Sequence, residues 1–192
     1  MNPFIEAFSQ ISPLSKEAKR VLEPLIHKST YPKNTTLLKI GDDAPYLYFI
    51  QQGLFRIFSQ MNGNEVTQYF IQEGQFYGSV NSLLAGEPSN VGVHLLENTV
   101  LYYMDTKEFE KCSKDYLELE RAGHQMLRLG FLENQARLEG LQFQSAKDRY
   151  LSLEENQPGL LNRVPLKYIA SYLGITPVSL SRIRAEFISN KA

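Results

Sequence analysis

The residues best suited to chemistry lie near the end of the chain, in the stretch IASYLGITPVSLSRIR, residues 169–184. The apolar spacing of this stretch predicts two short helices joined by a tight turn, in which Gly174 supplies the positive φ. Thr176 is a good N-cap, and Pro177 fits the first position of the second helix. Such a pair buries one face of each helix and leaves the outer face of the second helix open to a partner.

The outer face of the second helix has side chains that match the base edges and phosphates of DNA. Arg182 can donate two hydrogen bonds to a guanine, and Val178 and Ala185 are placed to touch thymine methyl groups. The hydroxyls suit phosphates or base edges, and the remaining cations would hold the unit on the DNA backbone. The predicted contacts are Thr176, Pro177, Val178, Ser179, Ser181, Arg182, Arg184, Lys167 and Arg163.

The distribution of charge points to the same part of the chain. The whole chain has a formal net charge of −1, whereas residues 163–192 have five Lys or Arg side chains against one Glu, a balance of +4. A polyanion would therefore meet the tail rather than the body. Charge alone would favour a solvated basic face, so it is the helical pattern that decides in favour of DNA.

The body of the chain reads as many short strands. From Thr35 to Met104, β-branched and aromatic runs alternate with turn residues, which is typical of an antiparallel roll. Asn62-Gly63 is a strong hairpin signal, and Gly78–Pro88 reads as a short helix and loop inside the sheet. Residues 3–28 read as short helices, one of them capped by Ser12.

A single long helix is predicted for residues 115–144, and it has two apolar stripes. We expect one stripe to pack on its own domain and the other to pair with a second copy of the chain. The resulting parts are a roll with N-terminal helices (1–114), a dimerisation helix (115–144) and a DNA-binding end (145–192). The first stripe comprises Leu119, Ala122, Met126, Leu129, Leu132 and Ala136, and the second Leu127, Phe131, Leu138 and Leu141.

This order of parts, with the motif DRYLSL…NRVPLKYIASYLGITPVSLSRIR, resembles the Crp/Fnr family of bacterial transcription regulators. The resemblance implies an α+β fold: an N-terminal β-roll of cyclic-nucleotide-binding type, a central dimerisation helix and a C-terminal helix-turn-helix. It maps the arginine of the recognition helix to Arg182 and a serine of the Fnr branch to Ser181. Val178 stands where the family has a glutamate, so the usual operator half-site does not transfer. The match is to short members without a β-hairpin wing, since the chain ends eight residues after Arg184.

In the cyclic-AMP branch of that family, a Gly-Glu pair and an Arg-Ser/Thr pair hold the sugar and the phosphate. Gly78 keeps its place here, but Ser79 replaces the glutamate, and Ser89-Asn90 replace the second pair. The chain has no Lys or Arg between Arg56 and Lys107, although a buried phosphate needs a compensating cation or several N–H donors. We therefore expect no control by cyclic AMP. The weak candidate for an effector pocket is Gly78, Ser79, Val80, Ser89 and Asn90.

Other chemistries find little support in the sequence. A single cysteine, Cys112, excludes a disulfide framework and an iron–sulfur cluster, and three scattered histidines do not suit the metal site of a cupin-type enzyme. We thus expect no enzyme activity, catalytic residue, metal or cofactor. Without an apolar run of about 20 residues or a signal peptide, the protein is expected in the cytoplasm, away from membranes.

The expected partners are double-stranded DNA and a second copy of the chain, and an unidentified small-molecule effector is left open. The alternative function is a ligand-binding roll whose helical tail docks a protein instead of DNA. Salt dependence separates the two, because phosphate contacts make affinity fall steeply with salt.

Overall fold

The computed structural model describes residues 2–189, without the side chains of 188 and 189. These residues form two compact units, one of residues 2–59 and 69–130 and the other of residues 60–68 and 131–189. The domain boundaries predicted near residues 114 and 144 do not coincide with these units. The reason is the long helix α4 (Leu117–Phe143), whose first half belongs to one unit and whose second half belongs to the other.

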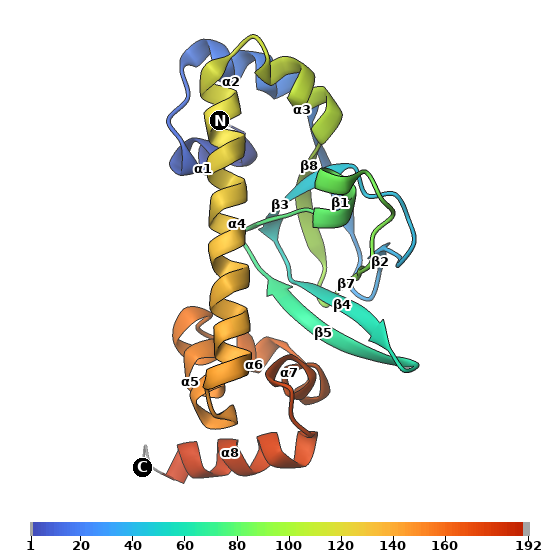
Figure 1. Ribbon diagram of the computed structural model, residues 1–192, viewed down its shortest axis with the longest axis vertical. Helices are drawn as coiled ribbons and strands as arrows, with labels where there is room; N and C mark the ends of the chain where they lie inside the picture. The colour runs from blue at the N-terminus through green and yellow to red at the C-terminus, as the bar shows by residue number, and fades with distance from the viewer. Residues whose placement is uncertain (1, 190–192) are drawn as a thin grey trace. The chain divides into compact units, whose positions relative to one another are not determined.

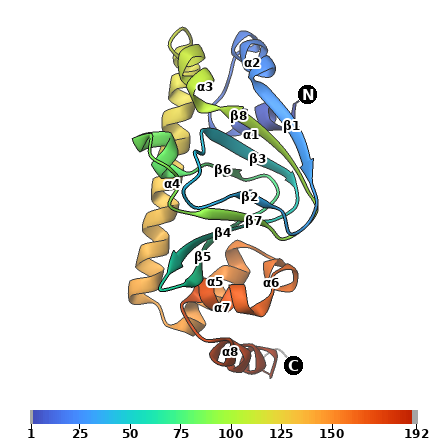
Figure 2. The same ribbon diagram turned by 90° about the vertical axis from the view of Figure 1, so that its right-hand side faces the viewer.

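The strands form a roll of two sheets, ordered β1-β8-β3-β6 and β2-β7-β4-β5 (Figure 2), and only the tip of the β4–β5 hairpin, residues 60–68, is assigned to the second unit. The pairs β1–β8, β3–β8, β3–β6, β4–β7 and β2–β7 are antiparallel, as the alternating sequence pattern predicts. The roll begins earlier than predicted, because residues 26–31 pair along the whole of β8. The strands are β1 (Ile26–Tyr31), β2 (Thr36–Leu38), β3 (Tyr46–Gln52), β4 (Phe55–Met61), β5 (Asn64–Ile71), β6 (Phe76–Tyr77), β7 (Gly92–Leu95) and β8 (Thr99–Asp105).

Helices cover one end of the roll and enclose a second apolar core. They are α1 (Pro3–Ile11), α2 (Lys16–Leu22), the 3-10 turn η1 (Glu23–Leu25), α3 (Thr106–Ser113) and the first half of α4 (Figure 1). Phe4, Phe8 and Leu22 meet Leu119 and Ala122 of α4 in this core, and all five side chains are fully buried. This contact confirms that the first α4 stripe packs on its own domain over the opening turns of the helix.

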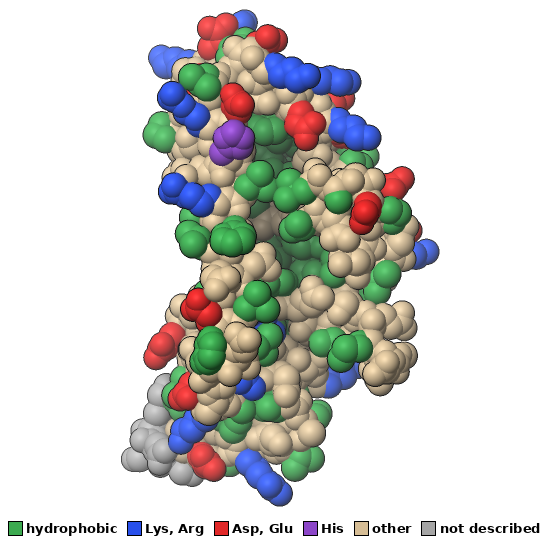
Figure 3. Space-filling view, in the orientation of Figure 1, with side chains coloured by type: hydrophobic (Ala, Val, Ile, Leu, Met, Phe, Trp, Pro, Cys, Tyr) green, Lys and Arg blue, Asp and Glu red, His purple; other side chains and the backbone are tan. Residues whose placement is uncertain are grey.

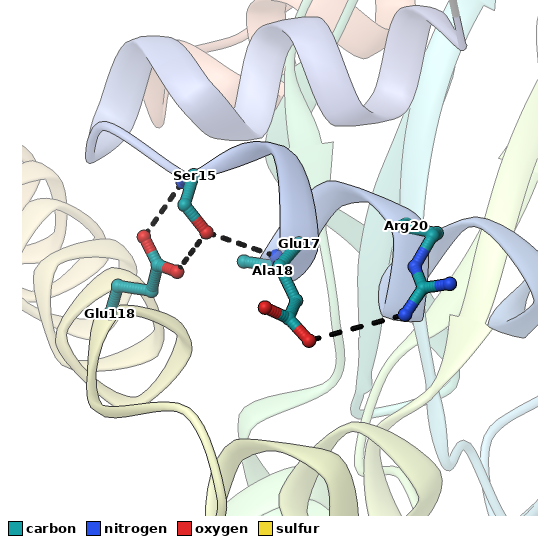
Figure 4. A network of polar contacts seen from close by, with 5 residues as sticks. All are labelled: Ser15, Glu17, Ala18, Arg20 and Glu118. Atoms are coloured by element: carbon teal, nitrogen blue, oxygen red, sulfur yellow. Dashed lines mark hydrogen bonds and ion pairs between the residues drawn. The ribbon is translucent and has the colours of Figure 1, made fainter.

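The start of α4 is tied to the start of α2 by a polar network (Figure 4). The Ser15 backbone N–H donates to Glu118 Oε2 at 2.7 Å, and the Ser15 hydroxyl donates to Glu118 Oε1. The same hydroxyl caps α2 by accepting from the Ala18 N–H, so Ser12 was the wrong choice of cap. These hydrogen bonds from Ser15 lower the pKa of Glu118. The nearby Glu17–Arg20 pair, at 4.0 Å and exposed, adds little.

Two predicted local features of the β-region are confirmed. Asn62 and Gly63 have φ values of 51° and 79°, as the turn between β4 and β5 requires. The Gly78–Pro88 segment contains a short π-helical turn, η2 (Asn81–Ala85). A Cβ on Gly78 would lie 2.4 Å from Leu83 Cδ1, so any larger residue there requires the Leu83 side chain to shift.

The described residues of the second unit comprise residues 60–68 of the β4–β5 hairpin, the second half of α4 and four further helices. These are α5 (Ala146–Asn156), α6 (Leu160–Arg163), α7 (Leu166–Leu173) and α8 (Pro177–Ser189). Ser145 and Asp148 form a complete capping box at the start of α5. The short helix α6 follows α5 after a turn at residues 157–159.

Candidate nucleic-acid interface and candidate effector site

The helices α7 and α8 pack together through the face that the apolar spacing predicts. Ile169, Ala170 and Leu173 of α7 and Leu180 of α8 are buried. Leu166, the first residue of α7, is 39% exposed. Below, these two helices and their turn are called the α7–α8 unit.

The turn of the α7–α8 unit has the predicted chemistry. Gly174 ends α7 with a φ of 68°, and its N–H and that of Ile175 bond to carbonyls of the last turn of α7. Thr176 caps α8, because its Oγ1 accepts from the Ser179 N–H at 3.1 Å. Pro177 then occupies the first helical position, where no N–H donor is needed.

The outer face of α8 presents a cation and a large apolar side chain to solvent. Arg182 is exposed, and Val178, one turn earlier, is 63% exposed. Ser181 is exposed, but its hydroxyl donates to the Pro177 carbonyl at 3.0 Å. The hydroxyls of Ser179 and Thr176 lie 3.0 Å apart and bond to each other. The polar hydrogens of this face therefore come mainly from Arg182.

The other predicted phosphate contacts have different surroundings. Arg184 is half-buried and interacts electrostatically with Tyr150 of α5, whereas Lys167 is exposed, with its Nζ 4.7 Å from the centre of the Tyr168 ring. Arg163 is half-buried at the end of α6. All of these cations belong to the same compact unit as α8.

Two arginines that sequence reasoning missed hold the end of α7. Arg149 of α5 donates to the Leu173 carbonyl through Nε at 3.1 Å and Nη2 at 2.8 Å, and through Nη1 to the Gln144 carbonyl. Arg137 of α4 donates to the Tyr172 carbonyl, and its guanidinium stacks 3.6 Å from the centre of the Tyr172 ring. Cations at a helix C-terminus also complement its dipole. No local sequence pattern reveals contacts of this range.

The hairpin between β4 and β5 also contacts α7. The Thr67 N–H donates to the Ser171 hydroxyl at 2.9 Å, across 104 residues of sequence. The tip of the hairpin, residues 60–68, accordingly belongs to the compact unit that contains α8.

In the candidate effector segment, two buried serines hydrogen-bond to each other. Ser79 and Ser89 are 2% and 1% exposed, and the Ser79 hydroxyl donates to the Ser89 hydroxyl at 2.9 Å. Ser89 in turn donates to the Val91 carbonyl. Val80 and Asn90 point to solvent instead. The positions that should hold an acid and a cation thus hold a neutral, internally satisfied pair.

Arg56 does not supply the missing cation to the roll interior. Its neighbours Phe55 and Ile57 lie in the roll core, so strand alternation directs Arg56 and Phe58 to the opposite face of the sheet. There the Arg56 guanidinium is fully buried, 4.8 Å from the Phe58 ring.

The roll core contains the aromatic side chains Tyr48 and Phe55, with Tyr77 packed against them. Burial raises the pKa values of Tyr48 and Tyr77, and the buried Tyr77 hydroxyl has no hydrogen-bond partner among the described residues.

Within the described part of the chain, no cluster of His, Cys, Asp and Glu could hold a metal. Cys112 is half-buried, which raises its pKa and disfavours the reactive thiolate. No helix among the described residues is long and apolar enough to cross a membrane.

Comparison with known proteins identifies the roll and places the fold. Residues 28–116 match the cyclic nucleotide-binding domain family. No protein with a curated description matches the chain in sequence.

Three solved structures illustrate the likeness of fold. The c-di-GMP responsive regulator CLP of Xanthomonas campestris has a TM-score of 0.72 at 16% identity, over 92% of this chain and 93% of that one. FixK2 of Bradyrhizobium japonicum has a TM-score of 0.73 at 17% identity, over 86% of both chains. The catabolite activator protein of Thermus thermophilus has a TM-score of 0.59 at 19% identity, over 96% and 88%. At these identities, the likeness shows the fold.

Proposed function

We propose that this chain is a sequence-specific, DNA-binding transcription regulator of the Crp/Fnr type that acts as a homodimer. The observation that carries the proposal is the outer face of α8, where Val178 and Arg182 are exposed over a buried Leu180. A helix held in this way suits the major groove, where the first two turns of a recognition helix contact base edges. The fold shared with CLP, FixK2 and the catabolite activator protein supports this assignment.

The proposed DNA contacts of the α7–α8 unit, together with Arg163 of α6, divide into two roles. Arg182 bonds to the O6 and N7 atoms of a guanine, which gives about 1–3 kcal/mol of discrimination. Lys167, Arg163 and Arg184 hold phosphates, with Thr176 and Ser179 at the start of the helix. Phosphate contacts position the protein without reading sequence. The variants Arg182→Ala and Lys167→Ala should therefore fail in different ways.

The dimer forms through the second apolar stripe of α4. Its three leucines and its phenylalanine are exposed to solvent. Figure 3 shows apolar side chains on the surface along α4. Spacings of four, seven and three residues put all four on the seam of a heptad repeat, which buries such side chains against a second helix. Pairing two α4 helices sets the distance between two recognition helices, as half-sites about one DNA turn apart require. The exposures are Leu127 48%, Phe131 69%, Leu138 59% and Leu141 44%.

The roll does not take its signal from cyclic AMP. Ser79 and Ser89 bond to each other where a sugar clamp and a phosphate cation are needed, and both are buried. A phosphate placed there would lose its hydration without gaining a counter-charge. Any other effector acts through the Gly78–Pro88 segment on α4.

The first experiment is selection of a random duplex library with the purified protein, at two salt concentrations and without added ligand. Enrichment of a two-fold symmetric site, with affinity falling steeply with salt, supports the dimeric regulator. Arg182→Ala should then remove sequence preference, while Lys167→Ala weakens specific and random DNA alike. Absence of salt-dependent DNA binding, with or without cell extract, refutes it and favours a tail that docks protein. Cyclic AMP should leave the melting temperature unchanged.

A further inference from the structure

The outer face of α8 lacks most of the side chains that hydrogen-bond to base edges, and this absence suggests which base group it contacts instead. The outer face, at positions 178, 181, 182 and 185, has neither a carboxylate nor a side-chain amide. Glu186, at its border, pairs with Lys147 of α5 at 3.6 Å. The groups that accept from cytosine or bond to adenine at two points are therefore absent from this face.

The serine hydroxyl of this face has little discrimination to offer. Ser181 spends its hydrogen on the Pro177 carbonyl at 3.0 Å. A hydroxyl has one hydrogen to donate, so Ser181 can only accept from DNA. The readers that remain at the centre of the face are Arg182 and Val178.

Val178 has the properties of a reader rather than of a core residue. Among the α8 side chains that the structure describes, it is the only large apolar one in the open, at 63% exposure. A helical valine is held in one χ1 rotamer in about 90% of cases, so it loses little entropy on binding. In the major groove, the apolar group that a valine can contact is the 5-methyl of thymine.

We propose that Val178 makes this protein a reader of pyrimidine 5-methyl groups. This inference rests on the proposed function. Val178 and Arg182 are four residues apart on one face, about 6 Å along the helix, which corresponds to about two base-pair steps. Each half-site thus contains a guanine for Arg182 and, about two base pairs away, a thymine whose methyl group packs on Val178. 5-Methylcytosine presents the same methyl group, so it should substitute for that thymine in binding.

The test changes single methyl groups in the selected site. Each thymine is replaced in turn by deoxyuridine, which differs only by the missing methyl. Loss of one buried methyl group weakens binding about fourfold per half-site, or about 15-fold when both half-sites are changed. Val178→Ala should lose as much on the thymine site and then be indifferent to deoxyuridine. Because the side chain is exposed and alanine favours helices, this variant keeps the fold.

Two further arms make the result specific. Changing the sensitive T·A pair to C·G should weaken binding, and 5-methylcytosine at that position should restore most of it. Val178→Glu should instead favour cytosine over thymine, because a carboxylate accepts from the N4 amino group that thymine lacks. If a symmetric site is enriched but no thymine is sensitive, or if Val178→Ala stays as sensitive as the parent protein, the methyl-reading role is refuted while the regulator stands. If no DNA site is found at all, both proposals fail.

Discussion

Truncation of Phe131 should separate dimerisation from folding. Phe131 is 69% exposed and belongs to neither of the two apolar cores described above. Phe131→Ala should therefore leave the fold of the single chain intact. In the dimer, however, it removes the largest side chain of the seam from both copies.

The size of this effect follows from the exposed surface. Full burial of a phenylalanine contributes about 1.5–3 kcal/mol. With 69% of the side chain available, each copy contributes about 1–2 kcal/mol and the symmetric pair about 2–4 kcal/mol. Phe131→Ala should then raise the dissociation constant of the dimer by about 30- to 700-fold.

The assay is sedimentation equilibrium over a range of concentrations, with circular dichroism to verify the fold. Leu132→Ala is the matched control, since Leu132 is 55% exposed but lies on the other stripe, and it should change dimerisation less than about threefold. Phe131→Ala should also lose affinity for the symmetric DNA site while keeping that for a single half-site. Equal weakening by both variants, or a dimer unaffected by Phe131→Ala, would refute the assignment of the seam.

Three further predictions concern the surroundings of this helix. Asn134 is a polar residue at a heptad position of the proposed seam, where such a residue fixes the register of the two helices at a cost in stability. Asn134→Leu should therefore lower the dissociation constant of the dimer in sedimentation equilibrium and allow more than one register. The variant should then discriminate less between DNA sites with different half-site spacings. Arg149→Ala leaves the Leu173 and Gln144 carbonyls without their donor, so it should lower the free energy of unfolding in urea by about 2 kcal/mol. An unchanged free energy of unfolding would contradict the stabilising role of this contact. Arg149→Lys should recover only part of the loss. Glu118 has a pKa held below its ordinary 4.5 by Ser15, so its contribution is complete above that value and is lost as the pH falls through the lowered pKa. The melting temperature of Glu118→Gln should thus fall less steeply between about pH 5 and 3 than that of the parent protein, whereas parallel curves would argue against this linkage.

Local chemistry explains which parts of the structure could be predicted from sequence. The turn at Gly174, the cap at Thr176 and the Asn62-Gly63 hairpin each depend on neighbours within a few residues, and each is confirmed. The cap of α2 was misplaced because Ser12 and Ser15 both precede helical spacing. Glu118, 103 residues away, bonds to Ser15, and no local pattern contains that information.

The candidate site divides in the same way. The exposed positions of α8 follow from helical periodicity, and Val178 and Arg182 lie where the spacing puts them. The hydroxyl of Ser181 was counted as a DNA contact, yet the structure shows it spending its hydrogen on the helix backbone. The clamps from Arg137 and Arg149 join separate helices, so they become visible only once those helices are packed.

The hydrogen bond from Arg137 to the Tyr172 carbonyl restricts which insertions α4 can accept during evolution. Phe131 and Arg137 lie on one uninterrupted helix; Phe131 belongs to the proposed dimer seam, and Arg137 holds the end of α7. A single inserted residue between them would turn the clamp by about 100° away from the seam. Seven inserted residues would return it to nearly the same bearing, about 10 Å further along. Descendants of this gene should therefore tolerate insertions there in steps of seven codons, and each step should demand a differently spaced operator.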